Sequence, residues 1–156
     1  MKFTDRLNRG LEIFLVILMS VLVLDVLWQV FSRYLLASPS SFTDELAGFL
    51  LIWVGVLGAA YVAGKKEHLA IDILVQNSPP SRRKKLQYLI HSLILIFALG
   101  VMVIGGISLV YTRFVLDVKS AALQLPLGFV YIVLPLSGLL MIYYEIIHIL
   151  QLRKKS

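Results

Sequence analysis

Four long apolar segments occupy most of the 156 residues of this chain and constrain its fold more than any other feature. They cover residues 11–36, 46–64, 86–116 and 126–152. A helix rises about 1.5 Å per residue, so each segment is long enough to cross the apolar slab of a bilayer, which is about 30 Å thick. The sequence therefore predicts an all-α membrane protein with four transmembrane helices.

Positive charge alternates between the polar segments that flank these spans. Twelve of the fifteen Lys and Arg residues lie in the N-terminal tail, in the connection between the second and third spans, and at the C-terminus. The other three, Arg33, Arg113 and Lys119, lie in or beside the first and third connections. Because cytoplasmic segments are enriched in Lys and Arg, we expect both termini and the second connection in the cytoplasm.

The composition leaves little sequence for anything besides a membrane domain. The chain is 59% hydrophobic with a mean hydropathy of +0.87, so we expect residues 1–156 to form one domain. We attribute the net charge of +6 to the Lys and Arg residues that set the membrane topology and attract membrane lipids, and we expect no nucleic-acid binding. The absence of cysteine excludes disulfides and thiolate metal sites. The first apolar run exceeds the roughly 7 to 15 residues of a signal-peptide core, so we expect a retained helix, with cleavage at 37–40 as the alternative.

Asp25 lies in the middle of the first span, where a charged Asp costs at least about 2.5 kcal/mol. Gln29, Ser32 and Arg33 follow at i+4, i+7 and i+8, which places all four residues on one stripe of a helix. Two interpretations remain open. Asp25 is either an ion or proton site, or a hydrogen-bonding group that joins two helices.

An acidic pair, Asp44 and Glu45, follows the first connection. Ser41 can cap a helix whose first turn holds these carboxylates, where negative charge suits the helix dipole. The pair could also contact Arg33 or a basic group on a partner, and the sequence leaves both roles open.

Small residues recur every four positions in the second span, at Gly55, Ala59 and Ala63. This spacing gives a face on which another helix can approach closely. We expect Trp53 and Tyr61 to face lipid or the membrane interface.

The connection after the second span contains His68 and Asp72 at i+4 spacing, beside a run of apolar residues. This pattern predicts an amphipathic helix along the membrane surface at about 66–77. The two side chains could begin a metal site, but no third ligand converges on them, so we favour a hydrogen-bonded pair and predict no metal or cofactor.

The last two spans carry glycines and prolines at defined positions. Gly100, Gly105 and Gly106 permit close packing or a bend in a third span that is longer than a bilayer requires. Pro126 suits the first turn of the fourth span, whereas Pro135 lies inside that span and should kink it. We expect Glu145 and His148, at i and i+3 near the end, to lie at the membrane interface.

The stretch TDELAGFLLIWVGVLGAAYVAGKKEHLAIDIL resembles the small membrane subunit, DctQ-like, of tripartite ATP-independent periplasmic (TRAP) transporters. The later stretch KSAALQLPLGFVYIVLPLSGLLM resembles a second block of that family. Together the two blocks cover about a third of the chain. The family often has an Arg three residues after the Glu, where this chain has Gly48. The matching positions are Asp44, Glu45, Trp53, Gly58, Ala59, His68 and Asp72 in the first block, and Ser120, Leu123, Pro126, Gly128, Tyr131 and Pro135 in the second.

This resemblance implies a multi-pass protein of a bacterial or archaeal inner membrane. It implies an auxiliary subunit that braces a large permease subunit, while a periplasmic binding protein delivers an organic acid for sodium-driven import. The residues agree with a non-carrying role, because no discontinuous helix or internal repeat of the kind that builds a substrate site is evident. No nucleophile, base and oxyanion donor occur together, so we do not expect an enzyme. A self-assembling proton-coupled exporter that uses Asp25 is the alternative function; a membrane-bound enzyme or lipid-binding scaffold has no supporting feature.

Overall fold

The computed structural model describes residues 2–36, 40–65 and 79–154, which form long helices packed side by side. Within these residues the single strand-like feature is an isolated antiparallel bridge between Lys119 and Pro126. In chain order the helices are α1 (Lys2–Tyr34), α2 (Ser41–Lys65), α4 (Pro80–Phe97), the π-helical segment η1 (Ala98–Gly105), α5 (Gly106–Val115), α6 (Leu127–Tyr131) and α7 (Val133–Lys154).

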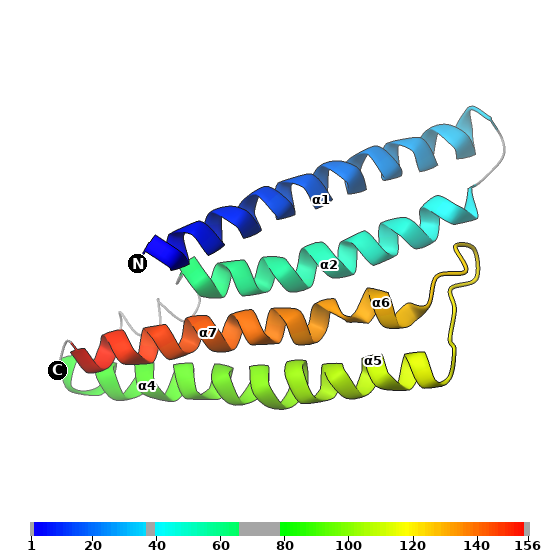
Figure 1. Cartoon of the computed structure of the whole chain (residues 1–156). Coiled ribbons are helices and arrows are strands. Elements are labelled where there is room, and N and C mark those ends of the chain that lie inside the picture. The colour runs from blue at the N-terminus through cyan, green and yellow to red at the C-terminus, as the bar shows by residue number, and fades with distance from the viewer. Residues whose placement is uncertain (1, 37–39, 66–78, 155–156) are drawn as a thin grey trace.

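The helices make four antiparallel columns, with both termini at the same end of the molecule (Figure 1). α1 lies along α2, α2 packs against α7, and α7 packs against the continuous column of α4, η1 and α5. Among the residues that the structure describes, four helical stretches are long and apolar enough to cross a membrane, which agrees with the predicted four spans and confirms the all-α class. They are Thr4–Tyr34, Ser41–Lys65, Arg82–Val115 and Leu127–Arg153.

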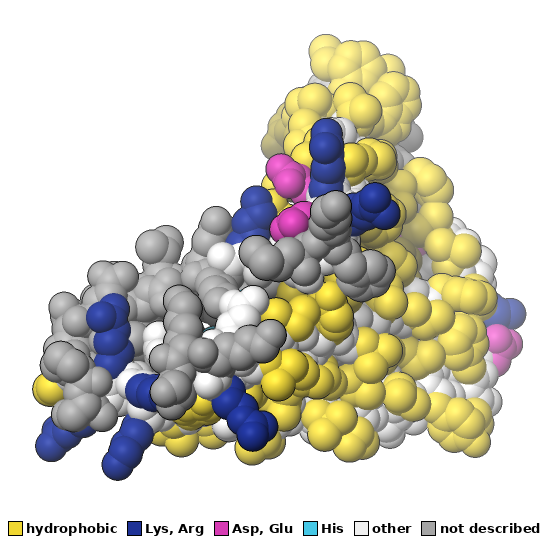
Figure 2. Space-filling model, turned by 60° about the vertical axis from the view of Figure 1, so that its left-hand side comes forward, with side chains coloured by type: hydrophobic (Ala, Val, Ile, Leu, Met, Phe, Trp, Pro, Cys, Tyr) yellow, Lys and Arg dark blue, Asp and Glu magenta, His cyan; other side chains and the backbone are white. Residues whose placement is uncertain are grey.

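Apolar side chains cover the outside of the bundle. Leu24, Leu27 and Trp28 of α1 are 67%, 60% and 53% exposed, and yellow apolar atoms extend over the flank of the molecule in Figure 2. A water-soluble protein rarely exposes so extensive an apolar surface. Helices satisfy their own backbone hydrogen bonds, so this surface suits contact with lipid or with another membrane protein.

α7 lies at the centre of the bundle, between α2 and the column that contains η1. On one side, Val133 and Tyr144 are buried with Leu57 of α2. On the other side, Met141 packs with Ala98 and with further small or flexible side chains. The Ser137 hydroxyl, fully buried, donates a 2.7 Å hydrogen bond to the backbone carbonyl of residue 56 on α2.

The small-residue face of α2 is only partly used inside the chain. Ala63 is buried together with Ala60, whereas Gly55 and Ala59 are exposed. A side-chain Cβ built at Gly55 would meet nothing within 4 Å, and the same is true of Gly58. The outer part of this face is therefore open to lipid or to another protein.

The long third span departs from regular α-geometry at its middle. Residues Ala98–Gly105 form a π-helical segment, a form in which the backbone hydrogen bonds reach one residue further. Gly106 directly follows this segment and lies against Pro135 of α7. This close contact explains why the chain has a glycine at position 106. Gly100 makes no such contact, because a Cβ built there would meet nothing within 4 Å.

The fourth span is interrupted, which corrects the expectation of continuous spans. α6 ends at Tyr131 and α7 begins at Val133, with a turn at Ile132. Pro135 has no backbone N–H to bond the carbonyl of Tyr131, four residues earlier, so the predicted kink occurs here. Pro126 precedes the first turn of α6 as its N-cap and is not a member of that turn.

Replacing Gly106 with Ala should destabilise the bundle by about 1–3 kcal/mol, the usual cost of overpacking a tight contact. The new methyl group would lie 2.9 Å from Cδ and 3.1 Å from the nitrogen of Pro135, whose ring cannot rotate away. The matched control is Gly100→Ala, which gains the same helix propensity without a clash. We expect a lower midpoint of thermal unfolding in detergent for Gly106→Ala only. Equal midpoints for both variants would contradict the packing described here.

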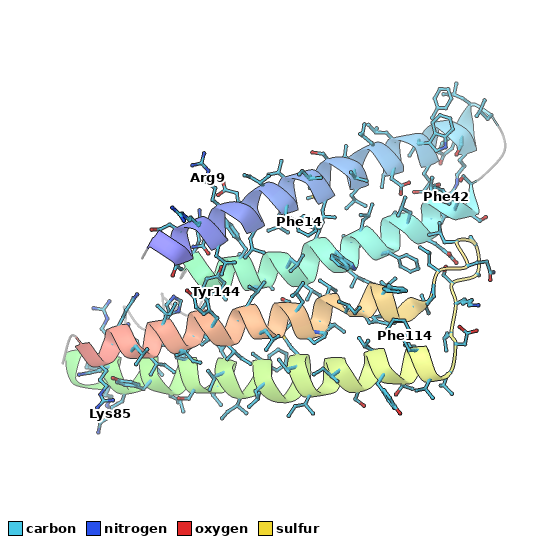
Figure 3. All side chains as sticks on the ribbon, in the orientation of Figure 1. Arg9, Phe14, Phe42, Lys85, Phe114 and Tyr144 are labelled. Carbon is cyan, nitrogen blue, oxygen red and sulfur yellow. The ribbon has the colours of Figure 1, made fainter. Side chains whose placement is uncertain are left out.

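Lys and Arg side chains gather at the end that holds both termini. Figure 3 places Arg9 and Lys85 there, and Figure 2 shows dark-blue groups around this end. The opposite end holds Arg33, Arg113 and Lys119. The surface helix predicted at 66–77, with His68 and Asp72, lies outside the described residues. The described Lys and Arg side chains at the end with the termini are Arg6, Arg9, Lys65, Arg82, Arg83, Lys84, Lys85 and Arg153.

Candidate functional site

Asp44 joins the start of α2 to the end of α1. Its Oδ1 accepts a hydrogen bond from the side-chain amide of Gln29 and lies 3.8 Å from Nη2 of Arg33. The Arg33 and Asp44 side chains are about half exposed, so this ion pair contributes little to stability by itself. Asp44 thus contacts Arg33, which is one of the roles that the sequence left open. The expected cap at Ser41 is wrong, because α2 already begins at that residue.

Glu45 connects α2 to a distant part of the chain. Its two carboxylate oxygens accept hydrogen bonds from the backbone N–H groups of Ala122 and Leu123, each at 2.9 Å. A carboxylate that accepts two such bonds makes charge-assisted contacts, which are stronger than neutral ones. Glu45 therefore holds the connection that links the third span to the fourth.

That connection, residues 116–126, is tightly folded. Asp117 and Gln124 have positive φ angles of 45° and 53°, a region that few non-glycine residues adopt. Ser120 is buried, and its hydroxyl accepts a 3.3 Å hydrogen bond from the backbone N–H of Leu125. The segment is thus a defined structure that presents two backbone N–H groups to Glu45.

Aromatic side chains close the same end of the bundle. The ring of Phe114 covers Gly128, where an added Cβ would lie 2.5 Å from a ring carbon, and Figure 3 shows Phe114 between α5 and α6. The guanidinium of Arg113 lies 5.8 Å from the centre of the Tyr131 ring. Tyr131, noted from the second sequence block, therefore contacts a basic group.

Trp53 makes contacts between helices inside the bundle. Its indole N–H donates a 3.0 Å hydrogen bond to the backbone carbonyl of Val130, near the interruption of the fourth span. The ring also packs edge-on against Phe14 of α1, at 6.4 Å between centres. Trp53 thus contacts two other spans, and the expectation that it also faces lipid or the interface stays a prediction.

Asp25 lies on the side of α1 that is covered by the bundle and is only 8% exposed. Ser32 on the same stripe is also buried, which agrees with the alignment expected from their spacing. Within the described residues, Oδ2 of Asp25 has no hydrogen-bond partner. Both interpretations of Asp25, as an ion or proton site and as a hydrogen-bonding group, stay predictions.

The end with the termini holds a second polar network. The hydroxyl of Tyr144 donates a 2.6 Å hydrogen bond to the side-chain oxygen of Asn8, and Thr4 pairs with Tyr143 at 3.2 Å. Figure 3 shows Tyr144 between α7 and the helices above it. The ring lies against Gly64, where a Cβ would come within 2.7 Å of it. These contacts attach the start of α1 to α7.

Glu145 and His148 are buried between helices, at 1% and 4% exposure, and the expectation that they lie at the depth of the membrane interface stays a prediction. Nδ1 of His91, on α4, lies 2.6 Å from Oε2 of Glu145. The centres of the His91 and His148 rings are 5.5 Å apart. The sequence showed the i, i+3 pair on one helix but gave no signal that His91 on another helix would join it.

The described contacts define a multi-pass membrane protein whose polar groups mainly join its own helices to one another. Residues 22–155 match the family described as tripartite ATP-independent periplasmic transporters, DctQ component. The chain belongs to this family, as the resemblance of its sequence motifs implied.

Proteins of similar sequence agree with this family. The chain is 27% identical, over 86% of its length and 81% of the relative, to a protein of Haemophilus influenzae provisionally named a TRAP transporter small permease protein. It is 28% identical, over 64% of its length and 57% of the relative, to the sialic acid TRAP transporter small permease protein SiaQ of Vibrio cholerae. A third match, at 39% identity, covers 36% of this chain and only 9% of the sialic acid TRAP transporter permease protein SiaT of Haemophilus influenzae.

This membership fixes the class of the protein. The chain is an auxiliary membrane subunit of a TRAP transporter, and it is not an enzyme, because its relatives are transporter subunits.

Proposed function

We propose that this chain is the small subunit of a sodium-driven transporter that imports an organic acid, such as a C4-dicarboxylate, a sialic acid or a sugar acid. In this role it braces the large permease subunit and does not itself carry substrate. The observation that carries the proposal is the family match over residues 22–155.

The fold supports a bracing role. The centre of the bundle is filled by side chains of α2, α7 and η1, and the interruption of the fourth span is packed against Gly106 and Trp53. In transporters, interrupted helices that bind substrate direct their free ends into a polar cavity. The exposed apolar surface of α1 and the open small-residue positions Gly55 and Ala59 suit contact with a larger membrane protein.

The same membership supports a proposal for the partners. We propose the large TRAP permease subunit as the direct partner, and a periplasmic substrate-binding protein as the component that delivers substrate. The relative SiaT is named a permease protein of a sialic acid TRAP transporter, which supports a large partner. Another relative, 25% identical over 80% of this chain and 20% of its own length, is the isethionate TRAP transporter permease protein DctMQ of Oleidesulfovibrio alaskensis. Sialic acid and isethionate are both organic acids, which supports the proposed substrate class.

For orientation, we propose an inner-membrane protein whose termini both lie in the cytoplasm. The support is the gathering of Lys and Arg at the end with the termini, against Arg33, Arg113 and Lys119 at the other. Anionic lipids on the cytoplasmic side would contact that basic end.

Reconstitution tests the proposed function. We expect this chain to copurify with the large permease subunit of the same transporter. In liposomes, this pair and the binding protein should take up one of three radiolabelled probes, a C4-dicarboxylate, a sialic acid or a sugar acid. Uptake should require an inward sodium gradient and should fall to background when this chain is omitted. Full uptake without this chain, or uptake driven equally by potassium, would contradict the proposal.

A further inference from the structure

Three side chains of kinds that bind metal ions lie close together where α4 packs against α7. His91 comes from α4, and Glu145 and His148 lie one turn apart on α7, so that both point to the same side of that helix. One ligand atom from each of the three lies within 4.8 Å of the other two. A bridge between two helices is thus built from two imidazoles and one carboxylate.

This group has the chemistry of a zinc site. Zn²⁺ accepts imidazole nitrogen at about 2.0–2.1 Å and carboxylate oxygen at about 2.0–2.2 Å, in tetrahedral geometry, which separates ligand atoms by about 3.3 Å. Because the three ligand atoms lie within 4.8 Å of one another, no two of them have to approach by more than about 1.5 Å. Nδ1 of His91 and Oε2 of Glu145, which are 2.6 Å apart, would have to separate by about 0.7 Å if both bind the ion.

A second observation comes from the carboxylate itself. Glu145 is 1% exposed, and its Oε1 is buried without a hydrogen-bond partner among the described residues. The other oxygen contacts His91. A buried carboxylate oxygen without a partner is costly, and a cation in the cluster would satisfy it.

The cluster borders a cavity at the end with the termini. His148 lines this cavity of about 390 Å³, together with residues of α1 and α2 such as Asn8 and Gly64. Three protein ligands leave a fourth position of a tetrahedral zinc ion for water or another ligand.

We propose that His91, Glu145 and His148 bind one Zn²⁺ ion, which clamps α4 to α7. The alternative is that His91 and Glu145 form a hydrogen-bonded pair beside His148 and that the three residues do not bind a metal ion. The proposal goes beyond the proposed function and does not depend on it, since it concerns contacts within this chain alone.

Zinc binding to the full chain tests the proposal directly. The chain is purified in detergent with an affinity tag that contains no histidine, stripped with a chelator, and equilibrated with Zn²⁺. We expect about one bound zinc per chain by elemental analysis, and a thermal midpoint several degrees higher than that of the stripped chain, since a ligand that binds only the folded state stabilises it. Mg²⁺ and Ca²⁺ should leave the midpoint unchanged, because they prefer oxygen ligands.

Variants distinguish this cluster from other sites. Glu145→Gln keeps the size of the side chain and a hydrogen bond to His91 but removes the charged ligand, so it should fold and lose zinc. His148→Asn should also lose zinc. The matched control is His68→Gln, which removes the third histidine of the chain and should retain zinc. A wild-type chain without bound zinc, or zinc retained by both cluster variants, would overturn the proposal.

Discussion

Replacing Glu45 with Ala is expected to release the connection at 116–126 and to lower the recovery of folded protein. The reason is geometric, because both oxygens of this one carboxylate accept hydrogen bonds from adjacent backbone N–H groups. Alanine leaves the N–H groups of Ala122 and Leu123 without these acceptors, and no main-chain rearrangement within the tight connection replaces them readily. The thermal midpoint should therefore fall, and the connection should lose its fixed link to α2.

The absence of cysteine allows a local measurement of this effect. A spin label on Ala121→Cys, an exposed position in the connection, should become more mobile when Glu45 is replaced. Asp44→Ala serves as the neighbouring comparison, since its contacts go to half-exposed side chains of α1 and not to the connection. Asp117→Asn removes an exposed carboxylate of the connection itself and tolerates the positive φ there. Equal label mobility in Glu45→Ala and in both comparisons would show that Glu45 does not hold the connection.

Most of the fold could be predicted from the sequence, because a bilayer admits few solutions. A run of about 20 apolar residues has to be a helix if it spans, so four runs predict four helices. The predicted first span begins at residue 11, inside the observed helix Lys2–Tyr34. The predicted fourth span begins at residue 126, one residue before α6. The prolines were also informative: Pro135 removes one backbone donor, and the helix is interrupted three residues before it, at Ile132.

The contacts between helices were much harder to predict. The positions of Asp44 and Glu45 in α2 were evident, but their different partners depend on the tertiary fold, with Glu45 reaching residues 77 and 78 positions away. Periodicity placed small residues on one face of α2, yet only Ala63 of that face is buried in the chain. Which face of an apolar helix meets another helix and which meets lipid is weakly encoded, since both environments are apolar.

Glu145 and His148 show the same limit for polar residues. Their spacing placed them on one side of a helix, and their position near the end of the span suggested the interface. The structure buries them because α4 supplies His91 opposite the pair, 54 residues from Glu145 in the sequence. One helix in isolation could not reveal this, and only a pairing of α4 with α7 would have identified the cluster.

Asp25 is the residue that separates a bracing subunit from a carrier. Its carboxylate is covered by the bundle, and Oδ2 has no partner among the described residues. If the residue only contributes to helix packing, an amide of the same shape should be tolerated, since hydrogen bonds between membrane helices average only about 0.6 kcal/mol. A proton-coupled exporter requires the carboxylate to gain and lose a proton in each cycle, which an amide cannot do.

We therefore expect liposomes that contain this chain alone to show no transport, and liposomes that contain the complete transporter with Asp25→Asn to show near-normal sodium-driven uptake. The thermal midpoint of Asp25→Asn should be unchanged or higher, because the substitution replaces a buried ionisable group, whose Oδ2 has no partner among the described residues, with a neutral amide. Asp25→Glu is the matched control, since it keeps a titratable group in the same position. Under the bracing role both variants support uptake, because neither has to change protonation. Transport by the isolated chain that survives Asp25→Glu and disappears in Asp25→Asn would instead identify this chain as a carrier.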